Sequence, residues 1–252
     1  MKTDPEFANR AIDNYLRSLT ARQENKDGVV RHAIEDLQRG QPAAEGNPEL
    51  DPSFLNKFER HAEDATTEEK WGRVLAGEIR QPGTFSSKVL RVVDELDQGT
   101  AVLFEALCES RLGHFLPRCL TGEIRMVDVA RLVSADLLVE PGFTGQLQSF
   151  EVTEAKGQRL WLFTPGRHGF AFVHEGAYST LRHNRSGPII AQNQMPGVPI
   201  FLLTDAGRAL STILPDKQDA AADRLGALLA PALRPKELVR FYSDGAGYWR
   251  SR

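Results

Sequence analysis

Three residues in the second half of the chain have the types and spacing that metal-dependent nucleases use. Glu154-Ala-Lys156 fits the pattern (D/E)xK, and Asp136 precedes it, where such enzymes place a metal-binding aspartate. Two carboxylates can hold Mg²⁺, and the lysine can position the attacking water. The tripeptide is also frequent by chance, and Lys156-Gly157 is equally typical of a hairpin tip. Asp136, Glu154 and Lys156 are thus the candidate catalytic residues of an alternative, enzymatic function.

Basic and aromatic residues gather in a second candidate site, between residues 156 and 185. The chain carries 34 acidic and 31 basic side chains, so this local excess of positive charge stands against a net charge of −3. Arginine and lysine bind phosphates, and tyrosine can stack on a base. The alternative is a solvated loop whose charge has no binding role. The candidate nucleic-acid-binding residues are Lys156, Arg159, Arg167, Tyr178, Arg182 and Arg185.

The helix expected to begin near Met126 is the element that would enter a DNA groove, and its charges disfavour that role. Between Met126 and Val139 one arginine, Arg131, stands against Asp128 and Asp136. Sequence-specific readers of the major groove present several side chains to base edges. We therefore do not expect sequence-specific DNA recognition.

The run WGRVLAGEIRQPGTFS, at residues 71–86, is the most distinctive in the chain. One interpretation makes Glu78, His61 and Asp64 a metal or acid–base cluster, although no second histidine has ligand spacing. The other is structural: a tryptophan anchors the core, small residues admit a neighbouring backbone, and Pro-Gly ends the helix. We favour the structural motif, which comprises Trp71, Gly72, Ala76, Gly77, Pro82 and Gly83.

The sequence lacks the signatures of several common enzyme classes. It contains no GxxxxGK[ST] phosphate loop, no GxGxxG after an expected strand, no GxSxG and no HExxH. His168, His174 and His183 do not have the spacing of a structural zinc site. We expect no cofactor and no metal, and we favour a non-enzymatic protein.

Composition indicates an ordinary globular chain. It has 252 residues, of which 41% are hydrophobic and 26% are charged. Cys108 and Cys119 form no CxxC pair, as expected in a reducing compartment. The N-terminal residues form no apolar signal core, and no run reaches the roughly 18 apolar residues of a membrane helix. We expect a soluble cytoplasmic protein that does not enter a membrane.

Periodic apolar residues predict a helical first half. A long helix is expected over Pro5–Arg39, with Gly28 as a candidate break, and further helices follow Asp51, Thr66 or Thr67, Ser86 and Asp97. We divide the chain into an N-terminal helix (1–40), a linker (41–50), a helical domain (51–113) and a second domain (114–252). The first helix is a candidate for self-association, although such a stripe more often packs on the core.

Strand-like runs predict a mixed second half. They flank turns such as EAKGQ and TPGRHG, one helix follows Thr204, and a last helix is expected over Asp219–Leu229. The order helix, helix, short strand and hairpin between Asp97 and about Phe172 resembles a winged helix. The expected fold class is α+β: a mostly helical N-terminal region followed by a winged-helix-like α+β region with β-hairpins.

Several segments resemble a bacterial family known only as domain of unknown function 2806. The similar segments are RQEN (22–25), LDPSFLNKFERHAEDAT (50–66), WGRVLAGEIRQPGTFS (71–86), LDQGTAVLFEAL (96–107) and, near the C-terminal end, LTDAGRAL (203–210). The resemblance covers the middle third well and implies a shared scaffold. It implies no activity.

Together these observations favour a non-enzymatic binding or regulatory module. Its partner would be a protein, a second copy bound through the helical region, or nucleic acid bound through the basic stretch. The alternative is the (D/E)xK-type nuclease. A role in phage defence or mobile elements is compatible with either function.

Overall fold

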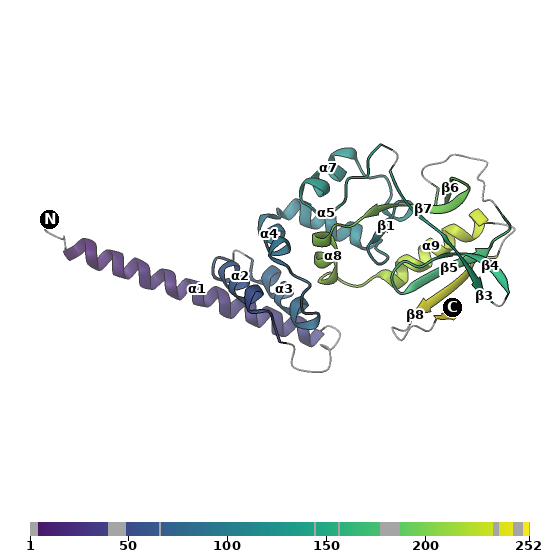
Figure 1. Cartoon of the computed structure of the whole chain (residues 1–252). Coiled ribbons are helices and arrows are strands. Elements are labelled where there is room, and N and C mark those ends of the chain that lie inside the picture. Colours follow the sequence, from purple (N-terminus) through teal and green to yellow (C-terminus); the bar gives the residue numbers. More distant parts are fainter. Residues whose placement is uncertain are drawn as a thin grey trace. The chain divides into compact units, whose positions relative to one another are not determined.

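The chain folds as an α+β protein, which confirms the expected fold class (Figure 1). The computed structural model describes residues 5–39, 49–65, 67–143, 145–155, 157–176, 187–233, 237–243 and 249–251. It divides into two compact units, Met1–Glu95 and Leu96–Arg252. The four-part division drawn from the sequence stays a prediction.

Four helices build the described part of the first unit. They are α1 (Pro5–Arg39), α2 (Pro52–Glu63), α3 (Glu68–Arg80) and α4 (Ser87–Glu95). Asp51 caps α2, because its carboxylate accepts a hydrogen bond from the N–H of Ser53 at 2.9 Å. Ser86 precedes α4, and its Oγ accepts from the N–H of Val89 at 3.4 Å. These helices begin where the sequence predicts.

The second half of α1 packs closely on α3. Gly72 of α3 makes this possible, because a Cβ there would lie 2.5 Å from Cβ of His32 and 3.0 Å from the backbone N of Ala33. The expected break at Gly28 is wrong: α1 continues through it. The carboxylate of Glu68 lies over Gly28, where a Cβ would be 2.0 Å from one of its oxygens, so a larger residue here would displace this flexible side chain.

The second unit combines short helices with two antiparallel sheets. Its helices are α5 (Gln98–Cys108), α6 (Arg118–Thr121), α7 (Met126–Ser134), α8 (Asp205–Thr212) and α9 (Gln218–Leu233). Its strands are β1 (Phe115–Pro117), β2 (Gln146–Ser149), β3 (Glu151–Ala155), β4 (Gln158–Phe163), β5 (His168–Val173), β6 (Ile190–Gln192), β7 (Met195–Leu202), β8 (Val239–Ser243) and β9 (Trp249–Ser251).

The two sheets use strands that are distant in sequence. The first has the order β1-β7-β2, with β6 also paired to β7, and the second has the order β3-β4-β5-β8-β9. The expected winged-helix-like segment, 97–172, therefore contributes strands to both sheets. Its strands β1 and β2 pair with β7, which lies beyond that segment. Local patterns predict the strands, but long-range pairing decides their partners.

A hydrophobic core joins both sheets to α9. Phe150, Trp161 and Phe172 come from the β2–β5 region, Ile200 from β7 and Leu225 from α9, and all five are at most 4% exposed. The first turn of α8 is fixed by Thr204, whose Oγ accepts from the N–H of Gly207 at 3.0 Å. This rigid core supports the surface on which the candidate site lies.

Candidate binding groove of the second unit

Helix α7 has apolar residues on two faces. Leu132 points into the core and is fully buried. Met126, Val129, Ala130 and Val133 lie one or two turns apart, at the spacing i, i+3, i+4 and i+7, and face a groove instead. Met126 is 89% exposed. A second apolar face that the core does not cover is typical of a surface that binds a partner.

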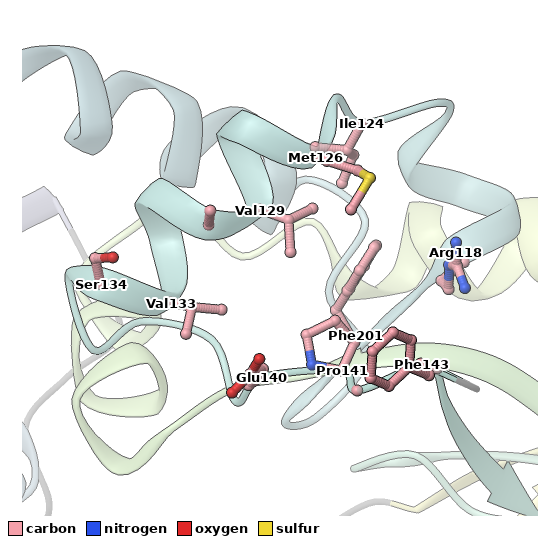
Figure 2. A pocket seen from close by; sticks show the side chains of 13 residues that line it. Arg118, Ile124, Met126, Val129, Val133, Ser134, Glu140, Pro141, Phe143 and Phe201 are labelled. Atoms are coloured by element: carbon pink, nitrogen blue, oxygen red, sulfur yellow. The ribbon is translucent and has the colours of Figure 1, made fainter.

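The groove lies between α7 and the segment that leads into β2. Its volume is about 660 Å³. In Figure 2, Val129 and Val133 project from α7 toward the side of the groove formed by Pro141, Phe143 and Phe201. Phe143 is fully exposed, whereas Phe201 of β7 is 5% exposed. The lining residues are Arg118, Ile124, Met126, Val129, Ala130, Val133, Ser134, Glu140, Pro141, Gly142, Phe143, Gly145 and Phe201.

Two residues of opposite charge, Arg118 and Glu140, line this mostly apolar surface. The guanidinium of Arg118 is 5.1 Å from the ring centroid of Phe201, within range of a cation–π interaction. Gly145, which has a φ of 74°, lies beside it, and a Cβ there would be 3.1 Å from Nη1 of Arg118. Gln146, the first residue of β2, is hydrogen-bonded to β7, because its Oε1 accepts from the N–H of Leu202 at 2.9 Å. The guanidinium of Arg118 therefore lies over the ring of Phe201.

The ionised residues of α7 and its cap are largely compensated locally. Arg125 donates to both carboxylate oxygens of Asp128, at 2.7 and 3.0 Å. These hydrogen bonds lower the pKa of Asp128. Arg131 lies near Asp97, whose pKa it helps to lower, although hydrogen bonds from Thr100 contribute more. The groove face of α7 itself carries no ionisable side chain.

The three candidate nuclease residues lie on separate elements, insofar as the structure describes them. Asp136 follows α7 with a φ of 56°, and its carbonyl accepts a hydrogen bond from Oγ1 of Thr204. Glu154 lies exposed on β3, opposite Arg159 of β4. Lys156 lies outside the described residues. Among the described residues, no group of three His, Cys, Asp or Glu side chains could hold a metal ion.

Two members of the candidate nucleic-acid surface lie within the described residues. Arg159 is exposed on β4. Nη2 of Arg167 lies 3.3 Å from Oδ2 of Asp216 and 3.2 Å from Oδ1 of Asp219, and its guanidinium lies 5.6 Å from the ring of Tyr242. Arg167 therefore ties β5 to α9 and has much of its charge compensated. Lys156, Tyr178, Arg182 and Arg185 lie outside the described residues.

The Trp71–Ser86 run forms a helix and a corner in the first unit. Trp71 is 2% exposed and stacks on His61, with ring centroids 4.7 Å apart. Glu78, 1% exposed, accepts hydrogen bonds from the N–H groups of Gly83 at 2.6 Å and Phe85 at 2.9 Å. Of the structural-motif residues, Gly72, Ala76 and Gly77 are buried in α3, and Pro82 and Gly83 form the corner.

Sequence reasoning missed the groove, although part of its signal was present. The run MVDVARLV places apolar residues at four positions of one helical face and Leu132 on another. A helix with two apolar faces needs two apolar environments, and this pattern could have predicted an exposed one. Arg118 and Phe201 carry no such signal, because only the pairing of β1 with β7 brings them together.

The fold and the groove define an α+β protein with an apolar groove on its second unit. Residues 9–112 match a family described as protein of unknown function (DUF2806), which confirms the resemblance for the segments between residues 22 and 107. The match covers the first unit and reaches into the start of the second. No curated protein and no solved structure matches the chain. Among the described residues, no helix is long and apolar enough to cross a membrane.

Proposed function

We propose that the second unit is a protein-binding module that holds an apolar segment of its partner in the α7 groove. The observation that carries this proposal is the exposure of Met126 and Phe143 at the rim of a preformed apolar cavity. Methionine, phenylalanine and arginine are enriched in protein interfaces, and anchors cluster where the surface is concave. The groove combines all three residue types.

The position of α7 in the fold supports the same function. The order α5, β1, α6, α7, β2, β7 and the sheet order β1-β7-β2 are compatible with a winged-helix-like arrangement, with β3–β6 as an insertion. In that arrangement α7 takes the place of the helix that reads DNA. An apolar face at this place favours a protein partner over a phosphate backbone.

The chemistry of the groove also predicts what its partner presents. A helix with apolar side chains at i, i+3 or i+4 and i+7 fills such a groove, and each anchor removes apolar area from water on both sides. Arg118, at one end, would favour a carboxylate at the matching end of the partner segment. The expected occupant is therefore an amphipathic helix with an acidic residue near one end.

The test is a selection of short helical peptides from a randomised library, followed by affinity measurements on variants of the full chain. Met126→Glu places a charge at the groove rim, and we expect it to weaken the selected peptides by at least about tenfold, or about 1.4 kcal/mol. Val127→Glu is the matched control, because Val127 is 60% exposed on the same helix and does not line the groove.

The outcomes separate this function from the alternatives. Peptides that bind both variants equally well would contradict the groove as the binding surface. Binding of random DNA or RNA that weakens steeply with salt and is insensitive to Met126→Glu would favour the nucleic-acid surface instead. Mg²⁺-dependent cleavage that is lost in Glu154→Ala would favour the nuclease.

A further inference from the structure

Helix α1 carries an apolar stripe that the first unit leaves uncovered. The described side chains from Asn9 to Glu24 are all exposed. The first half of the helix extends beyond α2 and α3 (Figure 1). We define the α1 stripe by six residues that fall within a sector of roughly 60° at ~100° per residue. They are Ile12, Leu16, Leu19, Gln23, Val30 and Ile34.

Both ends of the stripe are exposed, although the helix packs elsewhere along its second half. Ile12 and Leu16 are 56% and 54% exposed, and Val30 and Ile34 are 48% and 50% exposed. Val29, by contrast, is fully buried. Helix α3 thus covers a different face from the stripe. An aliphatic stripe that the fold itself does not bury indicates an external partner.

The stripe is nearly symmetric about Gln23. Leu16 and Val30 lie seven residues before and after it, and Ile12 and Ile34 lie eleven residues before and after it. A two-fold interface requires this property, because each residue of one copy must meet its counterpart from the other. Antiparallel pairing about Gln23 places Ile12 against Ile34 and Leu16 against Val30 of a second copy, whereas Leu19 lies opposite Asp27.

The charges of α1 permit this pairing. Within α1 six acidic and six basic side chains balance, so two copies carry no net repulsion. Lys26, which borders the stripe, donates to Glu59 at 3.0 Å and to Glu63 at 3.2 Å, both on α2. Its charge is therefore compensated within its own chain. Nε2 of Gln23 donates to Oδ1 of Asp27 in its own helix at 2.8 Å, and the amide can still pair with its counterpart through its carbonyl oxygen and second N–H, as a polar residue that fixes register in a helical seam.

We propose that the protein forms a two-fold dimer through antiparallel pairing of its α1 helices, centred on Gln23. The seam from Ile12 to Ile34 is about 33 Å long at ~1.5 Å per residue. Five aliphatic side chains per copy, each about half exposed, place the buried area toward the low end of specific interfaces. The dimer should accordingly dissociate on dilution, with a Kd on the order of micromolar. This dimer is independent of the groove on the second unit.

Sedimentation of the full chain across a concentration series tests the association. The expected result is a monomer–dimer equilibrium that Leu16→Glu shifts at least about tenfold toward monomer. Ala21→Glu is the matched control: it adds the same charge at an exposed site on the opposite face of α1 and should leave the equilibrium unchanged. Far-UV circular dichroism checks that both variants keep their helix content. A wild-type chain that remains monomeric, or equal dimerisation of both variants, overturns the proposal.

Disulfide formation under mild oxidation tests the direction and register. Gln23→Cys should yield a covalent dimer, because position 23 faces itself across the two-fold axis. Ile12→Cys alone should not, whereas Ile12→Cys combined with Ile34→Cys should. The wild-type chain gives the background from Cys108 and Cys119, whose thiol pKa values burial raises to about 12 and about 11. Cross-linking by Ile12→Cys alone, without cross-linking at position 23, would indicate a different pairing and contradict the proposal.

Discussion

Glu78 has the residue type of a catalytic acid, yet in this fold it acts as a backbone acceptor. Its two carboxylate oxygens take the N–H groups of Gly83 and Phe85, the two residues around which the chain turns between α3 and α4. A buried carboxylate is tolerated only when such donors surround it. The corner and the carboxylate therefore depend on each other.

Substituting Glu78 should destabilise the first unit. Glu78→Ala leaves two N–H groups without their acceptor, one of them on buried Phe85, and we expect a loss of about 2–4 kcal/mol in the free energy of unfolding. Glu78→Gln retains one acceptor and should lose less. Urea unfolding followed by circular dichroism measures both. A Glu78→Ala variant within about 0.5 kcal/mol of the wild type would contradict this role.

Sequence predicted single residues unevenly, for physical reasons. The structural interpretation of the Trp71 run follows from local features: a helical period, small residues and a Pro-Gly stop. The ion pairs of Arg167 could not be predicted, because its acidic neighbours Asp216 and Asp219 lie at the start of α9 and just before it, about fifty residues away. A positive charge in a sequence does not reveal whether it faces solvent or an acidic partner.

The close approach of the α1 and α3 backbones limits the size of the residue that α3 can have at position 72. Gly72 faces α1, and a Cβ there would lie 2.5 Å from Cβ of His32, which cannot rotate away. Gly83 has a φ of 88° with no atom within 4 Å of the corresponding position, so a substitution there strains only its own backbone. Gly72 therefore permits close helix packing, whereas Gly83 permits a left-handed backbone conformation at the corner.

This difference predicts an order of stabilities. Gly72→Ala should cost about 1–3 kcal/mol through overpacking, despite the helix propensity that alanine adds. Gly83→Ala should cost about 1 kcal/mol or slightly more, the strain of a left-handed backbone. Thermal unfolding of both variants provides the comparison. If Gly72→Ala proved as stable as the wild type, the close α1–α3 approach would be wrong.

The cap of α5 predicts a pH dependence. Hydrogen bonds from the hydroxyl and N–H of Thr100, at 2.6 and 2.9 Å, lower the pKa of Asp97 in the folded chain. A lowered pKa contributes stability that is fully present above the unfolded value of about 3.9 and is lost progressively as the pH falls through the lower pKa of the folded chain.

The stability difference between wild type and Asp97→Ala should therefore shrink between about pH 7 and about pH 3. Asp97→Asn keeps an acceptor but cannot titrate, so its difference from Asp97→Ala should stay nearly constant over the same range. Urea midpoints of the three proteins measure this. If the wild type exceeded Asp97→Ala in stability by the same amount at about pH 3 as at about pH 7, Asp97 would not cap α5 as an anion.

The elements themselves were more predictable than their partners. Helix starts at Asp51, Asp97 and Thr204 follow from capping residues, and strand runs follow from β-branched and aromatic residues. The position of β7 between β1 and β2 has no local signal. Because that pairing brings Phe201 beneath α7, the groove could not be predicted from the sequence, whereas the exposed half of its lining on α7 could.

At the scale of the whole molecule, each unit has one apolar surface that its own fold leaves open. In the first unit it is a long stripe on a helix, which suits a partner of the same shape. In the second it is a concave apolar groove that Arg118 and Glu140 also line, which suits a different segment. The protein we propose therefore associates with itself through one unit and binds a partner through the other.

Hydrogen exchange of the full chain, with and without a peptide selected for binding, tests the central claim most directly. The account predicts slower exchange of backbone amides in Met126–Ser134 and in Glu140–Phe143, with little change in β4 and β5. Protection confined to β4 and β5, with α7 unchanged, would contradict the groove as the binding surface.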